Sequence, residues 1–268
     1  MRPQLFTSLL FVVFCQSIHA HIETIPFADA TAKRLCIEQW DSDGDGEISF
    51  EEAAAVKSFG SVFCRLLLQG PTSLNELQYF TGVEELQERA FTDSYHLRSI
   101  ALPVSIKVIH EKAFWSCVEL EDIQIPTSTQ RLGHSCFFRC TSLQEIVVPP
   151  SVRDSIPYQC FAYCSELQKA DVEANVSIIG EAAFFECTRL QTVVLPYTTT
   201  RIEHHAFSGC SELRQLFCRA TTPPKVYGDT FDPSIMDKAV LFVPDGSLEA
   251  YRQAAVWCDF KYIVGTFD

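Results

Sequence analysis

The sequence predicts an α/β repeat solenoid with short parallel strands, and two observations lead to this fold class. The first is that phenylalanine recurs at intervals of 23, 23, 24, 23, 23 and 24 residues, at Phe91, Phe114, Phe137, Phe161, Phe184, Phe207 and Phe231. The second is that other apolar residues recur at fixed offsets from each Phe. A period in this range is typical of a solenoid, in which one unit buries its apolar side only by stacking on its neighbours.

Each unit carries the same apolar marks after its Phe. Three residues on, five units have a cysteine: Cys117, Cys140, Cys164, Cys187 and Cys210. Six residues on, the units have a leucine: Leu97, Leu120, Leu143, Leu167, Leu190 and Leu213. The run Leu-x-x-Ile-x-Ile ends in an alternation of period two, which predicts a short strand. A proline often follows, and it ends the strand because it has no N–H to donate.

These marks combine into the unit A-F-x-x-C-x-x-L-x-x-I-x-I-P, seen for example from Ala183 to Pro196. The unit closely resembles the BspA-like (Treponema-type) leucine-rich repeat family, over about residues 68 to 231 and the C-terminal cap. The resemblance implies a leucine-rich repeat solenoid in a surface or secreted protein of bacterial type. It also implies adhesion to host proteins or to other cells.

The two ends of the array depart from the repeat, as terminal units usually do. A first, degenerate unit is expected to start at Leu68 and to place Leu74, Leu77, Tyr79 and Leu86 at the repeat positions. After Phe231 we expect a cap, with a strand over 239–243 and a helix over 248–257 whose N-cap is Ser247. The stretch from Leu241 to Trp257 looks like the end cap common in this repeat family.

The N-terminus predicts export. Arg2 is followed by an apolar run from Leu5 to Phe14, and Ala20 marks a signal-peptide cleavage site, so residues 1–20 are expected to be removed. Cys15 leaves lipoprotein processing open as the alternative. The apolar run is too short to span a bilayer, and no second stretch qualifies as a transmembrane segment. We therefore expect a secreted or cell-surface protein.

The charge balance disfavours some classes of partner. The formal net charge is −13, and removal of residues 1–20 takes away Arg2 and no acid, which gives −13 − 1 = −14. A chain this acidic, without a Lys/Arg cluster, is a poor partner for nucleic acid or for anionic membrane surfaces.

Residues 41–52 match the twelve-residue calcium loop of an EF-hand position by position. The predicted calcium ligands are Asp41, Asp43, Asp45, Glu47 through its carbonyl, Ser49, and Glu52 as the bidentate ligand. Gly46 permits the sharp turn at loop position six. A hard cation takes many oxygen ligands, and without one these carboxylates repel one another. The alternative is a solvated acidic turn that binds no ion.

Helices are expected on both sides of this loop, over 29–40 and 51–59, the second ending at Gly60. Only one loop of this kind occurs, so the hand lacks the partner strand of a paired hand, and its calcium affinity is expected at about 10⁻⁴ to 10⁻³ M, as in extracellular modules. We expect calcium to stabilise a small cap on the solenoid. Five apolar residues are expected to dock it: Phe59, Val62, Phe63, Leu66 and Leu67.

The outward side chains of the strands form the predicted binding face, since solenoids bind partners on such a surface. The candidate partner-binding residues lie ten residues after each Phe: Gln124, Val147, Asp171, Val194 and Phe217. Val147, Val194 and Phe217 are apolar where water is expected, which indicates a contact strip towards the C-terminal half. The alternative is that these are scattered exposed apolar residues, which are common.

The cysteines offer three interpretations. The repeat position predicts a buried ladder of free thiols, while an exported chain also permits disulfides. The two C-x3-C pairs at 136/140 and 160/164 permit a metal site as a third reading. After removal of residues 1–20, eleven cysteines remain, so at least one is unpaired in a monomer.

No catalytic motif is present, neither a metalloprotease helix nor a nucleophile elbow nor a phosphate loop, and no enzymatic activity is predicted. The sequence instead predicts four segments: a signal peptide (1–20), a single EF-hand module (21–66), leucine-rich repeats (67–231) and a C-terminal capping unit (232–268). The predicted function is that of an exported calcium-binding protein that acts in recognition or adhesion of a protein or glycan partner, for instance in host extracellular matrix or on a cell surface. The alternatives are an envelope scaffold stabilised by calcium and a calcium-triggered switch. The sequence leaves the oligomeric state open.

Overall fold

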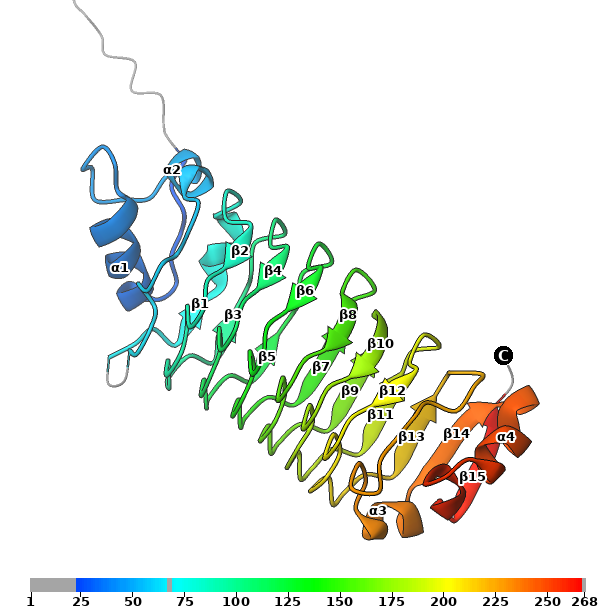
Figure 1. Cartoon of the computed structure of the whole chain (residues 1–268). Helices are drawn as coiled ribbons and strands as arrows, with labels where there is room; N and C mark the ends of the chain where they lie inside the picture. The colour runs from blue at the N-terminus through cyan, green and yellow to red at the C-terminus, as the bar shows by residue number, and fades with distance from the viewer. Residues whose placement is uncertain (1–22, 67–68, 267–268) are drawn as a thin grey trace, which may run out of the picture.

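Each repeat unit forms one turn of an elongated solenoid in the computed structural model, which describes residues 23–66 and 69–266. Figure 1 shows the turns stacked side by side, with helices α1 (Ala30–Trp40) and α2 (Phe50–Ala55) at one end. Helices α3 (Pro233–Lys238) and α4 (Leu248–Gln253) lie at the other end. The predicted signal peptide lies outside the described residues. No helix in the described part of the chain combines the length and the apolar character needed to cross a bilayer.

From Phe91 to Phe231 each repeat unit contributes a strand at the predicted place, and the strands of this row pair in parallel. These strands are β1 (Ser73–Leu74), β3 (Ser99–Ile100), β5 (Asp122–Ile123), β7 (Glu145–Val148), β9 (Lys169–Val172), β11 (Thr192–Leu195), β13 (Gln215–Cys218), β14 (Val240–Pro244) and β15 (Tyr262–Thr266). They form a three-stranded sheet, β1-β3-β5, and a six-stranded sheet, β15-β14-β13-β11-β9-β7. The predicted repeat of short parallel strands is confirmed.

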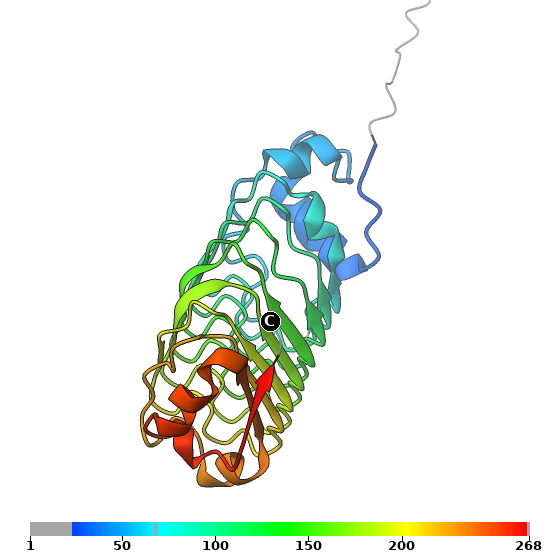
Figure 2. The ribbon, with the colours of Figure 1, turned by 90° about the vertical axis from the view of Figure 1, so that its right-hand side faces the viewer.

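A second row of strands lies further along each turn. It contains β2 (Glu85–Leu86), β4 (Val108–Ile109), β6 (Arg131–Leu132), β8 (Arg153–Ile156), β10 (Asn175–Ile179) and β12 (Arg201–Ile202). These strands form two further parallel sheets, β2-β4-β6 and β12-β10-β8. The view along the solenoid in Figure 2 shows the two rows on different sides of the core.

The phenylalanines of the repeat form one continuous stack through the core. Consecutive rings from Phe91 to Phe231 lie 5.0 to 5.4 Å apart between centroids, and their planes are nearly parallel. The cysteine of each unit donates its S–H to the carbonyl of a Phe, as Cys117 does to Phe91 at 3.1 Å. Burial raises the pKa of Cys164 to about 12, so its thiol remains a donor. The predicted ladder of buried thiols is thus confirmed.

The C-x3-C pairs do not form a metal site. In the described residues, the one group of acidic, Cys or His side chains close enough to share an ion consists of Asp41, Asp43 and Asp45. Cys140 and Cys164 instead donate to main-chain carbonyls, at 3.2 Å in each case. The metal interpretation of these cysteines was therefore wrong, because the repeat directs each thiol towards the neighbouring turn.

The first turn begins earlier than predicted. Leu68 lies outside the described residues, but Leu74 pairs with Ile100, three positions later in the repeat than expected. Phe63 takes the place of the first repeat Phe, because its ring stacks on Phe91 with centroids 5.5 Å apart. The 3₁₀ helix η1 (Asn75–Tyr79) separates β1 from β2 and lengthens this turn. The predicted register of the first strand was therefore wrong by three residues.

The C-terminal cap differs from the prediction in its helix. Strand β14 confirms the expected strand within one residue, but α4 ends at Gln253 and a separate 3₁₀ helix, η3 (Trp257–Asp259), follows. The chain leaves the helix so that Trp257 is buried, where its indole N–H donates to the carbonyl of Pro224 at 2.8 Å. Ser247 ends the 3₁₀ helix η2 (Asp245–Ser247) and occupies the N-cap position of α4, as predicted, but its side chain makes no capping hydrogen bond.

Candidate functional site

The acidic loop connects α1 to α2, and both helices begin with a side-chain cap. The Asp29 carboxylate accepts hydrogen bonds from the N–H groups of Thr31 and Ala32, at 2.8 and 3.0 Å. Ser49 and Glu52 form a reciprocal capping box at the start of α2. Helix α2 ends at Ala55 rather than near Phe59, because the chain turns to an extended conformation at Val56 and buries Phe59 in the core. The predicted length of this helix was therefore wrong.

The loop brings three of the predicted calcium ligands together. Carboxylate oxygens of Asp41, Asp43 and Asp45 all lie within 4.8 Å of one another. Asp41 accepts hydrogen bonds from the N–H groups of Gly44 and Gly46, at 2.7 and 3.0 Å. Gly46 has φ +83°, a left-handed conformation that favours glycine. The backbone thus folds around the aspartates as the loop pattern requires.

The carboxylates of Glu52 and Glu47 make other contacts. The Glu52 carboxylate accepts from the N–H of Ser42 at 2.7 Å and from the N–H of Ser49 at 2.9 Å, and it does not belong to the aspartate group. Burial raises the pKa of Glu52, but the hydrogen bonds from Ser49 and Ser42 outweigh this effect and lower the pKa to about 2. The side chain of Glu47 pairs with the ammonium of Lys33 at 2.6 Å.

The donor set fits a hard divalent cation. Calcium takes six to eight oxygen ligands, and clustered carboxylates, a main-chain carbonyl and a hydroxyl are its usual protein donors. The three aspartates supply such oxygens at one place, and Glu52 is hydrogen-bonded to Ser42, between the first two of them. To bind the ion, Glu52 would have to give up its hydrogen bonds from Ser42 and Ser49. The loss of these bonds would reduce the binding free energy.

A short segment before α1 pairs with the acidic loop. The carbonyl of Ile48 accepts a hydrogen bond from the N–H of Ile25 at 2.8 Å, and Thr24 forms an antiparallel bridge with Ser49. In paired EF-hands a second loop makes this contact. The sequence analysis missed the segment, because Ile25 carries no motif and only its burial marks it. The loop is therefore supported within the chain itself.

The helical module is fixed to the first turns of the solenoid. Phe59 and Phe63 are buried as predicted, Val62 and Leu66 are partly buried, and Leu67 lies outside the described residues. Trp40 adds an aromatic contact that the sequence analysis missed, with its ring centroid 5.3 Å from that of Phe80.

A polar contact at Asp29 also holds the module in place. Asp29 accepts from the N–H of Thr72, just before β1, at 2.8 Å. Burial raises the pKa of this carboxyl, yet its hydrogen bonds to Ala32, Thr72 and Thr31 lower the pKa below its ordinary value. One carboxylate thus caps α1 and ties it to the solenoid.

The predicted binding face is formed by the outward side chains of the strands, and the structure corrects it at one position. Gln124 is exposed, Val147 is 47% exposed, and Asp171 is half-buried. Val194 points outward but is only 8% exposed, because it lies in register between Asp171 and the larger Phe217 on the two adjoining strands. Val194 is therefore not available to a partner.

The outward row extends beyond the predicted residues. Phe217 is half-buried and stacks on Phe242 of β14 with centroids 4.4 Å apart, and Phe242 pairs with Val264 of β15. We call Val147, Asp171, Val194, Phe217, Phe242 and Val264 the sheet-face row. Tyr262, beside this row, is 46% exposed and Val264 is 43% exposed. The sequence analysis did not find Phe242 and Val264, because β14 and β15 lie outside the repeat and their register could not be predicted from it.

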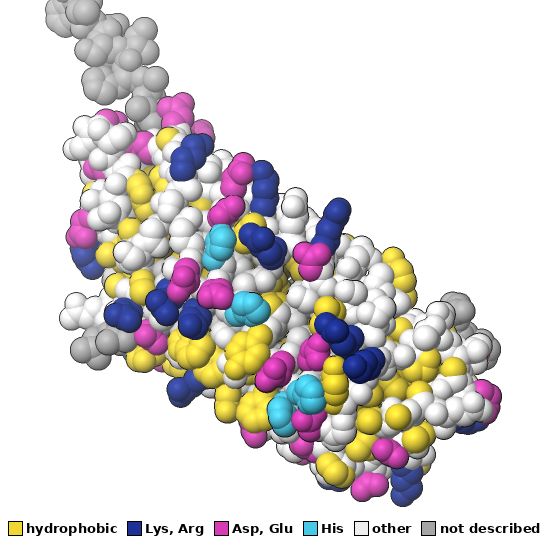
Figure 3. Space-filling model, in the orientation of Figure 1, with side chains coloured by type: hydrophobic (Ala, Val, Ile, Leu, Met, Phe, Trp, Pro, Cys, Tyr) yellow, Lys and Arg dark blue, Asp and Glu magenta, His cyan; other side chains and the backbone are white. Residues whose placement is uncertain are grey.

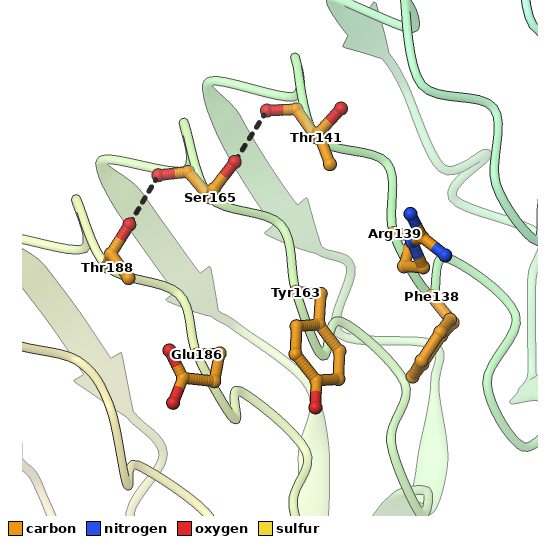
Figure 4. Close-up of a pocket in the computed structure, with 7 residues that line it drawn as sticks. All are labelled: Phe138, Arg139, Thr141, Tyr163, Ser165, Glu186 and Thr188. Carbon is orange, nitrogen blue, oxygen red and sulfur yellow. Dashed lines mark hydrogen bonds between the residues drawn. The ribbon is translucent and has the colours of Figure 1, made fainter.

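A shallow hollow of about 520 Å³ lies on the turns that carry the repeat Phe residues, and it is distinct from the sheet-face row. Figure 4 shows Tyr163 in it between Arg139 and Glu186, with a row of hydroxyl side chains above them in the view, those of Thr141, Ser165 and Thr188. Ser165 donates to the carbonyl of Thr141 at 3.4 Å, and Thr188 donates to that of Ser165 at 3.3 Å. These hydroxyls thus join successive turns through hydrogen bonds.

One broad face of the solenoid carries mixed charge. In Figure 3 basic and acidic side chains lie next to each other on the face turned to the viewer, and hydrophobic and histidine side chains gather between them. Several of the charges pair between neighbouring turns, such as Lys107 with Glu84 at 2.8 Å. Exposed pairs of this kind contribute little to stability, but they leave no large area of one sign on this face.

Comparisons with known proteins agree with the repeat. The model of the BspA type leucine-rich repeat region matches residues 68–155 and 154–231. A leucine-rich repeat protein from Bacteroides ovatus is 24% identical, with a TM-score of 0.51 over 62% of this chain and 42% of that one, which shows a shared fold. A leucine-rich repeat protein from Eubacterium ventriosum is 18% identical, with a TM-score of 0.49 over 68% and 43%.

The Treponema pallidum leucine-rich repeat protein is 25% identical, with a TM-score of 0.49 over 65% of this chain and 77% of that one. The chain thus spans about two fifths of the length of the Bacteroides and Eubacterium proteins. No curated protein matches the sequence. The matched residues comprise more than half of the chain, and they are the turns that carry the Phe stack and the strands. The chain belongs to the BspA type leucine-rich repeat family.

Proposed function

We propose that the chain is an exported recognition protein that binds a protein or glycan partner through the sheet-face row. Its partner belongs to the extracellular matrix of a host or to a cell surface. Residues 1–20 direct the export, and calcium in the loop 41–52 stabilises the N-terminal module. This function rests on non-covalent binding, in keeping with a family of repeat proteins that generally act through interactions.

The observation that carries this proposal is the exposure of apolar and aromatic side chains on the six-stranded sheet. Val147, Val264 and Tyr262 are each more than 40% exposed, and Phe217 and Phe242 form a stacked pair between them. Aromatic residues are enriched at protein interfaces, and an exposed apolar patch rimmed by polar residues often marks one. The strands Lys169–Val172 and Thr192–Leu195 supply polar neighbours on the same face.

Calcium in this proposal serves folding rather than signalling. Asp41, Asp43 and Asp45 would hold the ion together with the carbonyl of Glu47, Ser49 and Glu52. The loop lies at one end of the solenoid and the stacked pair Phe217 and Phe242 near the other (Figure 1). A switch would need a two-state element that connects them, and the continuous Phe stack between them is a single packed core. We therefore expect calcium to raise stability and to leave partner affinity unchanged.

A second function, an envelope-associated scaffold, is favoured by one specific observation. The module that carries the acidic loop is fixed to the solenoid by both Asp29 and a cluster of aromatic rings, as a permanent end cap would be. A scaffold needs the same calcium-stabilised cap but no ligand-binding row. The two functions therefore differ in whether the sheet-face row binds a soluble partner.

An array experiment separates them. The folded chain would be presented to immobilised extracellular-matrix proteins, mucins and glycans, once with calcium and once with chelator at a temperature where both forms are folded. Recognition predicts saturable binding to a defined partner in both conditions. Binding to none of them by a chain whose circular dichroism shows it folded would favour the scaffold. Binding that disappears with chelator would support the switch instead.

A further inference from the structure

Strand β15 is the last strand of the six-stranded sheet and pairs on one side only. It is parallel to β14 over all five of its residues, from the pair Val240 and Tyr262 to the pair Pro244 and Thr266, without a bulge. No other strand in the described part of the chain pairs with it. Figure 2 shows β15 in front of the other strands of its sheet.

The outer edge of β15 presents main-chain groups without partners. Alternate residues of a strand direct their N–H and C=O groups to opposite sides, and the only main-chain partner strand of residues 262–266 in the described chain is β14. Natural proteins usually protect such an edge with proline, charge, a bulge or very short length. The segment Tyr-Ile-Val-Gly-Thr has no proline and no charge. The opposite end of the strand row has a protected edge, because β1 has only two residues.

The side chains of this edge strand also favour a contact. Tyr262 and Val264 are 46% and 43% exposed on the face that carries Phe242, while Ile263 packs against the core on the other side. Ile263 thus anchors the strand to the core, and the outward face of the strand is apolar. An exposed, flat and uncharged edge strand acts as a template for another strand.

We propose that two copies of the chain associate through antiparallel pairing of β15 with β15 of the second copy. A two-fold axis at Val264 places Tyr262 opposite Thr266 of the other copy and Val264 opposite its own counterpart. This arrangement is closed and uses the same surface on both subunits, as homodimers usually do. A second copy fits this edge because residues 262–266 carry no charge, so two copies of the strand pair without like charges opposite each other, although the whole chain has a net charge of −13.

The dimer would join the two six-stranded sheets into one. The sheet-face row of each copy would then meet its counterpart at Val264. A surface that carries many copies of the partner would face two rows held at a fixed spacing. Two linked sites raise the apparent affinity for a repetitive surface without any new contact. The association itself does not depend on the proposed recognition function, so each can fail alone.

The mass in solution tests this proposal. Sedimentation equilibrium of the whole chain over a range of concentrations is expected to show a reversible dimer. The variant Val264→Lys is expected to be monomeric, because a lysine at the axis places two like charges opposite each other. Val104→Lys is the matched control, since Val104 is 76% exposed and lies away from β15, and this variant should dimerise like the wild type. A wild-type chain that stays monomeric, or a Val264→Lys dimer, would overturn the proposal.

Cross-linking tests the register. Cysteine is placed at Val264 or at Val104 in a Cys258→Ser background, because Cys258 is an exposed thiol. Mild copper-catalysed air oxidation removes one hydrogen from each of two thiols and forms one intermolecular disulfide, with oxygen as the electron acceptor. Residues directly opposite in an antiparallel pair have Cβ atoms about 4.5–5.5 Å apart. Val264→Cys should therefore cross-link and Val104→Cys should not. Equal cross-linking of both, or of Val104→Cys alone, would refute this interface.

Discussion

Replacing Phe137 by alanine tests the ring stack that holds the solenoid together. The Phe137 ring is fully buried and lies between two parallel rings, with centroids 5.2 Å from Phe114 and 5.4 Å from Phe161. Removal of a buried Phe side chain costs about 3–5 kcal/mol, because apolar transfer is lost and a cavity remains. We expect a value in the upper half of this range, since neighbouring turns are held at fixed spacing by main-chain hydrogen bonds and cannot collapse into the gap.

The assay is urea unfolding followed by circular dichroism, with the free energy of unfolding taken from the transition midpoint and slope. Two variants accompany Phe137→Ala. Phe137→Leu keeps most of the apolar volume and loses the ring stacking, so we expect it to lose less than Phe137→Ala. Val104→Ala changes an exposed side chain and is expected to stay within about 0.5 kcal/mol of the wild type. A loss of less than about 1 kcal/mol for Phe137→Ala would refute the view that this stack is the core.

Three further predictions concern the two ends. With a dissociation constant of about 10⁻⁴ to 10⁻³ M, about 10 mM calcium should stabilise the chain by about 1.4–2.7 kcal/mol and raise the melting temperature by several degrees, and Asp45→Asn should abolish most of this gain in a thermal scan. Folding lowers the pKa of Asp29, so the stability that its ionised carboxylate contributes is present above its ordinary pKa of 3.8 and is lost as the pH falls through the lower folded value. Asp29→Asn should therefore flatten the decline of the unfolding free energy in that pH window. An unchanged decline would show that Asp29 does not cause it. Tyr251→Phe removes a buried hydrogen bond of 2.7 Å to the carbonyl of Ala220 and should cost about 1–2 kcal/mol in urea unfolding, while no loss would mean that water replaces the hydroxyl.

The repeat from Phe91 onwards was predictable because its physics is local to one unit. The offsets that place Leu and Ile in the core repeat without change, so the strands and the thiol ladder follow from the pattern. The first turn could not be predicted in this way. Leu86 has the usual sequence separation from Phe91, so the extra residues earlier in this turn do not disturb the pattern. Only the stacking of Phe63 on Phe91 reveals the register.

Two other differences have the same kind of cause. Alternation predicts which way Val194 points, but its burial depends on the side chains of the adjoining strands, one turn away in space. In the cap, the apolar spacing from Leu248 continues past Gln253, so the pattern predicts a longer helix than the chain forms. Burial of Trp257 against the carbonyl of Pro224 decides the end, and that contact joins residues 33 apart.

The motif of the acidic loop predicted the shape of the turn but not all contacts of its side chains. The positions of the aspartates and of Gly46 predicted a turn that gathers three carboxylates, and the structure has that turn. The pattern did not predict that Glu52 binds Ser42 and Ser49, because these bonds compete with the ion for the same oxygens. It also could not show Ile25 bound to Ile48, since this pairing depends on where the preceding segment runs.

The sheet-face row is most directly tested by a matched pair of surface variants. Val147→Asp and Val104→Asp each add one acid at an exposed valine, and both should fold and melt like the wild type. Their affinity for the partner found on the array would be measured side by side. The account predicts that Val147→Asp loses at least tenfold in affinity, about 1.4 kcal/mol, while Val104→Asp binds normally. Equal affinity of the two variants would contradict recognition through this row.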